Sequence, residues 1–223
     1  MKFDEQEIKE INQFWKNYYI SNCKLCHGSG LREGKLCSCT KACNAAIQCE
    51  INGFGRLHLT KSLNDGNLKN NINDYFIKFN INKKIGRGLY IFGKYSTGKT
   101  LATAILAKNI LMIENPLGTN IFNIKFFLYD DLVRFSYDEH SFSTLETIIK
   151  RTNILVLDNI GNETGLHTSA RSSVSLLDNI IRNREMNGKI TWLTTQNSPE
   201  QFAQNYSEPL RQIIRRNYQI IHT

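Results

Sequence analysis

Residues Gly93 to Thr100 read GKYSTGKT, and they are the part of the sequence with the clearest chemical potential. The spacing of the glycines, the lysine and the threonine is typical of a loop that wraps phosphate groups. The glycines let the backbone N–H groups turn toward the phosphates. Lys99 would neutralise the β- and γ-phosphates of a nucleoside triphosphate, and the Thr100 hydroxyl would hold Mg²⁺. We expect nucleotide contacts from Gly93, Ser96, Thr97, Gly98, Lys99, Thr100 and Leu101.

The sequence around this loop fits the same interpretation. An apolar run, Leu89–Phe92, directly precedes the loop, and a helical stretch, Leu101–Met112, follows it. The order strand, loop, helix separates a phosphate-binding loop from a chance match to the pattern. The alternative is a loop that matches this motif by chance, and the flanking strand and helix make that interpretation less favourable.

Mg²⁺ also needs a carboxylate, and Asp158 is the candidate. It follows four apolar residues, Ile154–Leu157, so we expect it at the end of a buried strand. An acid at the end of a neighbouring strand is a usual second ligand for the metal in phosphate-loop proteins. The sequence therefore predicts that Asp158 and Thr100 share one Mg²⁺. An ordinary aspartate at a strand end is the alternative.

The second candidate site consists of cysteines, all of which fall between Cys23 and Cys49. Two close pairs, separated by a glycine-containing segment, have the spacing of a tetrahedral zinc site, because each pair offers two thiolates from one turn. We predict that Zn²⁺ is bound by Cys23, Cys26, Cys37 and Cys39. Reduced cysteines without metal are the alternative, and Cys43, Cys49 and His27 are substitute ligands.

Alternating elements must position these residues. Short apolar runs alternate with helical stretches, which predicts an α/β domain with a parallel sheet. The expected strands are Leu89–Phe92, Ile124–Tyr129, Ile154–Leu157, Ile190–Thr194 and Tyr218–Ile221. Near the N-terminus, helical spacing predicts one amphipathic helix that packs on its own domain or binds a partner. Its apolar stripe is Phe3, Ile8, Ile11, Trp15 and Tyr18.

Composition narrows the classes of partner. Of the 223 residues, 41% are hydrophobic, which is enough for a folded core. Lys and Arg exceed Asp and Glu by 28 to 20, and this excess favours a polyanionic partner such as nucleic acid. The apolar runs are far shorter than the roughly 20 residues of a membrane-spanning helix, so we expect no membrane partner. The acidic, amphipathic start is unlike a signal peptide, so we expect a cytoplasmic protein.

The phrase LVLDNIGNE, with GKYSTGKT before it and TWLTTQNSPEQF after it, resembles the AAA+ ATPases of the DnaC/DnaI helicase-loader family, which are close to IstB-like ATP-binding proteins. The resemblance runs from Gly88 to the end of the chain. It implies an AAA+ (ASCE P-loop) domain with five parallel strands, ATP as the nucleotide, and a spiral oligomer that binds single-stranded DNA. Because Thr223 comes just after the last expected strand, the resemblance also implies a domain without the C-terminal helical lid.

The domain organisation follows from the same comparison. We expect an N-terminal helix and zinc-binding, helicase-docking module in residues 1–50, a linker in residues 51–85, and the AAA+ ATPase domain in residues 86–223.

The chain departs from the family pattern next to Asp158. The family usually has Glu or Asp at the following position, where this chain has Asn159. An amide orients water but does not accept its proton, so general-base assistance of about 10²- to 10⁴-fold would be reduced or lost. We therefore expect a slow ATPase, with Glu163 as a candidate substitute for the missing carboxylate.

Two further catalytic roles are implied by the resemblance. The amide that senses the γ-phosphate aligns with Gln196, next to Asn197, and the arginine that completes a neighbouring subunit's site aligns best with Arg211, then Arg215. DNA-facing loops are expected at about residues 131–143 and 162–175, the latter with His167 and Arg171. Basic residues are spread through the ATPase region at Lys125, Arg134, Lys150, Arg151, Arg171, Arg182, Arg184 and Lys189.

The function favoured by the sequence is an ATP-dependent loader that binds a hexameric replicative DNA helicase and delivers it onto single-stranded DNA. An IstB-like transposition ATPase that binds DNA and recruits a transposase is the alternative, and the N-terminal cysteine pairs favour the loader. A nucleotide-sensing adaptor without catalysis is a third interpretation, suggested by Asn159.

Overall fold

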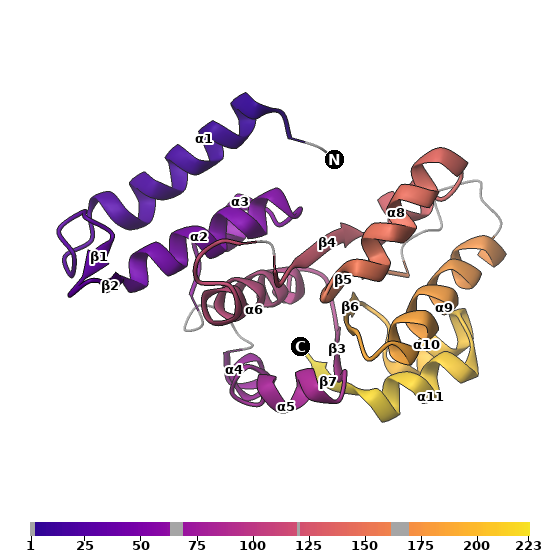
Figure 1. Cartoon of the computed structure of the whole chain (residues 1–223). Coiled ribbons are helices and arrows are strands. Elements are labelled where there is room, and N and C mark those ends of the chain that lie inside the picture. Colours follow the sequence, from indigo (N-terminus) through magenta and orange to yellow (C-terminus); the bar gives the residue numbers. More distant parts are fainter. Residues whose placement is uncertain (1–2, 63–68, 120, 162–169) are drawn as a thin grey trace. The chain divides into compact units, whose positions relative to one another are not determined.

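A computed structural model describes most of the chain, and its backbone is drawn in Figure 1. The described residues are 3–62, 69–119, 121–161 and 170–223. They form two compact units, which are treated separately below. The first consists of Met1–Leu63 and Ala104–Ile124, and the second of Asn64–Thr103 and Lys125–Thr223. Within the described residues, no helix has the length and apolar character needed to cross a membrane.

The second unit carries a parallel sheet of five strands. The strands are β3 (Gly88–Phe92), β4 (Ile124–Leu128), β5 (Ile154–Ile160), β6 (Ile190–Thr195) and β7 (Tyr218–His222). Their order across the sheet is β4-β5-β6-β3-β7, so β3 is held between β6 and β7. Each of the five apolar runs in the sequence forms one of these strands, which confirms the predicted fold class.

Helices cover this sheet. They are α4 (Lys69–Ile77), α5 (Phe79–Lys84), α7 (Tyr129–Phe135), α8 (Glu139–Arg151), α9 (Ala170–Met186), α10 (Pro199–Asn205) and α11 (Glu208–Asn217). One face of the sheet, with Tyr90, Leu157 and Leu193, shares a buried core with side chains from α7 to α11. On the other face, Tyr75 of α4 packs edge-on against Trp192 of β6 and accepts a 3.2 Å hydrogen bond from its indole N–H. Within β6, the neighbouring residues Trp192 and Leu193 thus face opposite sides of the sheet, as the strand period of two requires.

The first unit consists of α1 (Glu5–Lys16), a π-helical turn η1 (Asn17–Ser21), the short strands β1 (Leu31–Arg32) and β2 (Lys35–Leu36), α2 (Ser38–Ile51) and α3 (Arg56–Leu59). It also contains most of α6 (Lys99–Glu114), which begins in the second unit. A capping box at Asp4 and Glu7 starts α1, which runs beside α2 in Figure 1 and packs against it.

The predicted N-terminal helix is present, and two residues of its apolar stripe are buried in the core of the first unit. Ile11 and Trp15 are buried, whereas Tyr18 is 47% exposed. The indole N–H of Trp15 donates to Glu50 of α2 at 2.6 Å, and Arg56 forms an ion pair with the same carboxylate at 2.6 Å. These contacts tie α1, α2 and α3 together.

A buried lysine joins three segments of the first unit. Lys108 of α6 is 6% exposed, and its ammonium group donates to the Tyr19 hydroxyl at 3.1 Å, to the Leu59 carbonyl at 2.6 Å and to the Lys61 carbonyl at 2.5 Å. The Tyr19 hydroxyl itself donates to the Leu59 carbonyl at 3.1 Å. A buried ammonium group is tolerated only when it is hydrogen-bonded, so each of these acceptors stabilises the unit.

Replacing Tyr19 by phenylalanine is expected to destabilise the first unit by about 1–2 kcal/mol, because it removes an acceptor from the buried Lys108 ammonium. Tyr18→Phe is the matched control, since the Tyr18 hydroxyl makes one exposed 3.3 Å hydrogen bond to the Thr60 carbonyl. Its effect should stay within about 0.5 kcal/mol. Urea unfolding followed by far-UV circular dichroism measures both, and equal losses in the two variants would contradict the role of Lys108.

Candidate functional site

The phosphate-loop motif joins the end of β3 to the start of α6. Three of its residues have the left-handed backbone that favours glycine, with φ of 146° at Gly93, 58° at Ser96 and 93° at Gly98. At Gly93 a side chain is also excluded by space, because an added Cβ would lie 2.1 Å from the Thr223 hydroxyl oxygen. That hydroxyl lies 2.6 Å from the Thr97 hydroxyl. The end of β7 therefore packs directly on the loop.

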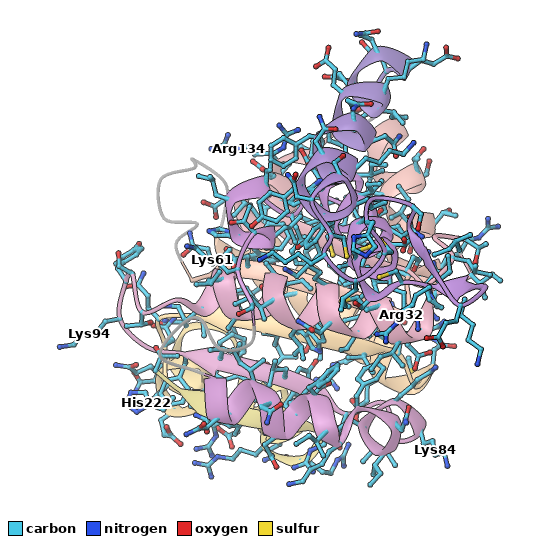
Figure 2. All side chains as sticks on the ribbon, turned by 90° about the vertical axis from the view of Figure 1, so that its left-hand side faces the viewer. Arg32, Lys61, Lys84, Lys94, Arg134 and His222 are labelled. Atoms are coloured by element: carbon cyan, nitrogen blue, oxygen red, sulfur yellow. The ribbon has the colours of Figure 1, made fainter. Side chains whose placement is uncertain are left out.

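The Lys99 side chain folds across its own loop. Its ammonium group donates to the carbonyl oxygens of Gly93 at 2.8 Å and Lys94 at 2.6 Å. Partial burial lowers the pKa of Lys99, and the Asp158 carboxylate acts in the opposite direction. By contrast, the exposed Lys94 side chain projects outward, on the same side of the second unit as His222 of β7 (Figure 2). Lys99 is thus the lysine that lies over the loop.

The structure brings Thr100 and Asp158 together. The Thr100 hydroxyl lies 3.0 Å and 2.9 Å from the two carboxylate oxygens of Asp158, to which it donates. Asp158 is 4% exposed. A hydroxyl and a carboxylate are the hard oxygen ligands that Mg²⁺ prefers, so this pair fits the ion chemically. The sequence places Asp158 at a strand end, but β5 continues to Ile160, so the acid lies inside the strand.

Strand β5 continues through a bulge. Leu157 pairs with Leu193 and Ile160 with Thr195, so three steps along β5 oppose two along β6. The extra residue leaves Asn159 with a φ of 65°. Asparagine tolerates this conformation better than most residues with a side chain. The backbone at position 159 therefore gives a physical reason for an asparagine that is independent of catalysis.

Asn159→Gly is expected to keep the thermal stability of the second unit within about 1 kcal/mol of the unchanged protein, because glycine adopts positive φ freely. Asn159→Val should cost about 1–3 kcal/mol, since a β-branched side chain is strained there. Thermal unfolding of both variants measures the difference. Equal stability of the two variants would show that the bulge relaxes.

The remaining predicted catalytic residues lie on other elements of the second unit. Gln196 directly follows β6, and Asn197 accepts a 2.8 Å hydrogen bond from the Tyr90 hydroxyl through its carbonyl. Arg211 lies on α11 and forms an ion pair with Glu208 at 2.5 Å. Arg215 of the same helix forms an ion pair with Glu200. Both arginines are therefore held by carboxylates of their own chain.

The four predicted zinc ligands form one cluster in the first unit. The Sγ atoms of Cys23, Cys26, Cys37 and Cys39 all lie within 4.8 Å of one another. The closest cross-pairs are Cys26 to Cys39 at 3.5 Å and Cys23 to Cys37 at 3.9 Å. Four thiolates at about 2.3 Å from a tetrahedral Zn²⁺ would be ~3.8 Å apart, so the cluster fits this ion.

A small hairpin brings the two cysteine pairs together. Strands β1 and β2 pair across Glu33 and Gly34, whose positive φ angles of 53° and 73° are those of a two-residue hairpin turn. The Gly30 amide donates to Cys26 Sγ at 3.3 Å. Burial raises the pKa of the Cys26 thiol, but this amide and the neighbouring thiols outweigh it and lower the value to about 7.

The substitute ligands considered from sequence lie outside this cluster. Cys43 and Cys49 are buried in α2, where burial raises the pKa of both thiols. His27 is exposed, beside the cluster in the chain, with a φ of 51°. Among the described residues, the four-cysteine set is therefore the one grouped for a metal.

One of the basic residues considered for DNA binding is buried in the second unit. Arg184 is 2% exposed, and burial lowers its pKa to about 10. Its guanidinium group donates to the Thr191 hydroxyl at 3.0 Å and to the carbonyls of Ile149, Thr152, Asn153 and Ile190. It therefore stabilises the end of α8 against β6. Glu163, His167 and the side chain of Arg171 lie outside what the structure describes.

A cavity of about 570 Å³ lies between α8 and α9. Apolar side chains of Phe142, Ile149 and Ile180 line it together with Lys189 and with the ion pair that Lys150 forms with Glu146 at 3.0 Å. None of its lining residues belongs to the phosphate loop, so it is a separate feature of the second unit.

Sequence reasoning missed one residue of the candidate nucleotide site, Thr194 of β6. Its hydroxyl donates to the Asp158 carboxylate at 2.6 Å and accepts from the backbone N–H of Asn159 at 2.9 Å. The two adjacent threonines at the end of β6 are the signal in the sequence that could have identified it. A strand buried on both faces is usually a continuous apolar run, so two polar residues in a row at its end are unusual.

No protein-family model and no curated protein matches the sequence. Among solved structures, the crystal structure of DnaI matches 76% of this chain and 91% of its own with 19% identity and a TM-score of 0.59. The crystal structure of the DnaC helicase loader matches 75% and 99% with 21% identity and a TM-score of 0.59.

A replication initiator is also similar in structure. DnaA bound to AMPPCP and single-stranded DNA matches 76% of this chain and 50% of its own with 13% identity and a TM-score of 0.55. At these identities the likeness concerns the fold. The chain therefore has the fold seen in DnaI and in the DnaC helicase loader.

Proposed function

We propose that this protein is an ATP-dependent loader, which binds a hexameric replicative helicase and delivers it onto single-stranded DNA. The observation that carries the proposal is the contact between Thr100 and Asp158 beside Lys99, in a fold shared with DnaI and the DnaC helicase loader. A phosphate loop with a facing acid is the arrangement that binds a nucleoside triphosphate and its metal.

In this proposal the chain's own groups divide the work of nucleotide binding. The Lys99 ammonium exchanges its carbonyl acceptors for phosphate oxygens, and the amides of the loop and of the first turn of α6 orient the phosphates. Thr100 and Asp158 hold Mg²⁺, which supplies charge neutralisation at the phosphates when bound. Gln196 orients the attacking water or the γ-phosphate, and Arg211 acts on the site of a neighbouring subunit in a spiral oligomer.

We further propose that hydrolysis is slow. Asn159 offers an amide where a carboxylate would accept a proton from water. ATP then serves mainly to stabilise the assembled, DNA-bound state, and turnover releases it.

The four-cysteine cluster supports a docking module that depends on Zn²⁺. The thiolates of Cys23, Cys26, Cys37 and Cys39 would hold the ion, which would stabilise a segment with two strands of two residues each. We propose that residues 1–50 contact the helicase. The cavity between α8 and α9 is the surface we propose for single-stranded DNA, with Lys189 as the cation for phosphate, and with Lys150 exchanging Glu146 for phosphate when DNA is bound.

The proposal is tested with the hexameric replicative helicase encoded by the same genome. The two proteins are mixed with and without ATP, the mass of the complex is measured by light scattering, and helicase transfer is measured on a single-stranded circle. We expect a complex and ATP-dependent transfer. Absence of any complex under every nucleotide condition would exclude the loader function while leaving nucleotide binding intact.

A further inference from the structure

The bulge in β5 places two neighbouring residues opposite one residue of β6. The register between the strands runs from Leu157↔Leu193 to Ile160↔Thr195. Asp158 and Asn159 therefore both face Thr194 across the strand pair. A bulge of this kind re-aims side chains and is common beside functional sites.

The Thr194 hydroxyl uses its hydrogen-bonding capacity on these two residues. It accepts a hydrogen bond from the backbone N–H of Asn159 at 2.9 Å and donates its own proton to the Asp158 carboxylate at 2.6 Å. A hydroxyl has a single proton to donate, so accepting from one residue helps fix the direction in which it donates to the other. Thr194 is 1% exposed, so water does not compete for either bond.

Asp158 is a buried carboxylate whose rotamer must be fixed if it is to bind a metal in one position. Its hydrogen bonds come from Thr100, on the phosphate-loop side, and from Thr194, on the neighbouring strand. Thr100 is itself a candidate Mg²⁺ ligand, whereas the Thr194 hydroxyl is occupied by Asp158 and Asn159. The bond from Thr194 is thus the one that remains independent of the metal.

We propose that Thr194 is a positioning residue of the nucleotide site, which aims the Asp158 carboxylate at Mg²⁺ and fixes the backbone at Asn159. This inference rests on the proposed function, because it assumes that the site binds a triphosphate with Mg²⁺. It predicts that Thr194 controls the Mg²⁺ dependence of nucleotide binding and has little influence on binding of the nucleotide without metal.

The matched control lies one residue further along β6. The Thr195 hydroxyl is equally buried. It donates to the Ile160 carbonyl at 2.7 Å and accepts from the backbone N–H of Asn197 at 3.1 Å. Like Thr194, it donates one hydrogen bond and accepts one. Both of its partners are backbone groups, whereas Thr194 donates to the side chain of Asp158. If Thr194 only stabilised the strand pair, Thr194→Val and Thr195→Val would have similar effects.

The experiment titrates Mg²⁺ into the full-length protein with a fluorescent N-methylanthraniloyl ATP. Thr194→Val is expected to raise the half-saturating Mg²⁺ concentration about tenfold, the effect of losing a hydrogen bond to a charged group. Thr195→Val should leave that concentration unchanged, and Thr194→Ser should restore it because serine retains the hydroxyl. In EDTA the affinity for the analogue should be the same in all variants.

Each outcome has one meaning. A wild-type Mg²⁺ midpoint in folded Thr194→Val overturns the positioning role, and no affinity of the unchanged protein for the analogue overturns the nucleotide site itself. Where circular dichroism shows that the valine variant is unfolded, Thr194→Cys takes its place. Its weaker donor should shift the midpoint in the same direction by a smaller factor, and an unshifted midpoint there also overturns the proposal. In an Asp158→Asn background, Thr194→Val should cause no further shift.

Discussion

Replacing Cys26 by serine is expected to abolish zinc binding and to unfold the cysteine-bearing part of the first unit. Structural zinc sites contribute about 10–16 kcal/mol of binding free energy that is coupled to folding. Serine supplies no thiolate, and the segment it belongs to has only the β1–β2 hairpin as regular structure before α2. The loss should spread toward α1, because Tyr19 and Ile20 pack against the cysteines.

Zinc content is measured by mass spectrometry of the purified protein, and folding of the segment by amide hydrogen exchange. Cys43→Ala is the matched control, since Cys43 is buried in α2 outside the cluster. It should retain zinc and normal exchange. The prediction is wrong if the unchanged protein takes up no zinc under reducing conditions, or if the control loses as much zinc as Cys26→Ser.

Lys99→Ala is expected to weaken ATP binding about 100-fold, because two charge-assisted hydrogen bonds to phosphate are lost at ~1.5 kcal/mol or more each. The same fold should remain, since the bonds of Lys99 within the protein go to two carbonyl oxygens of its own loop, those of Gly93 and Lys94. Titration calorimetry in the presence of Mg²⁺ measures the affinity directly.

Lys94→Ala is the control for charge. Lys94 belongs to the same loop and its side chain is exposed, so its removal changes the local charge equally. Its effect should stay within about twofold, because exposed charges are strongly screened. Similar losses in both variants would mean that the loop attracts ATP by general charge rather than through a specific lysine.

The centre of the sheet was predictable from sequence because β3, β5 and β6 are buried. Runs such as Leu89–Phe92 and Ile154–Leu157 are apolar on both faces, which is the pattern of a parallel sheet covered by helices. The phosphate loop and Asp158 were predictable because their chemistry requires fixed residue types at fixed spacing. The cysteine cluster was predictable for the same reason, and the structure distinguishes its four members from Cys43, Cys49 and His27.

Other features depend on contacts between distant residues, which spacing alone does not contain. Helices α3, α4 and α5 lie in the stretch that sequence reasoning treats as a linker, because their apolar positions are few and separated by asparagines. The bulge at Asn159 and the role of Thr194 depend on the register between β5 and β6. Arg184 looks like any surface arginine in sequence, and only the carbonyls around it reveal a structural residue. The predicted domain boundaries at residues 50 and 85 stay a prediction.

Each of the two units consists of two separate stretches of the chain, and this affects how the protein folds during synthesis. The first unit needs Ala104–Ile124 in addition to Met1–Leu63. At a translation rate of about 5–20 residues per second, its last segment follows the first by ~3–12 s. Until then the cysteine-bearing part emerges from the ribosome without all of its packing partners. Early metal capture would protect the nascent chain through that interval, so zinc starvation should reduce the yield of folded protein more than it reduces the stability of protein already made.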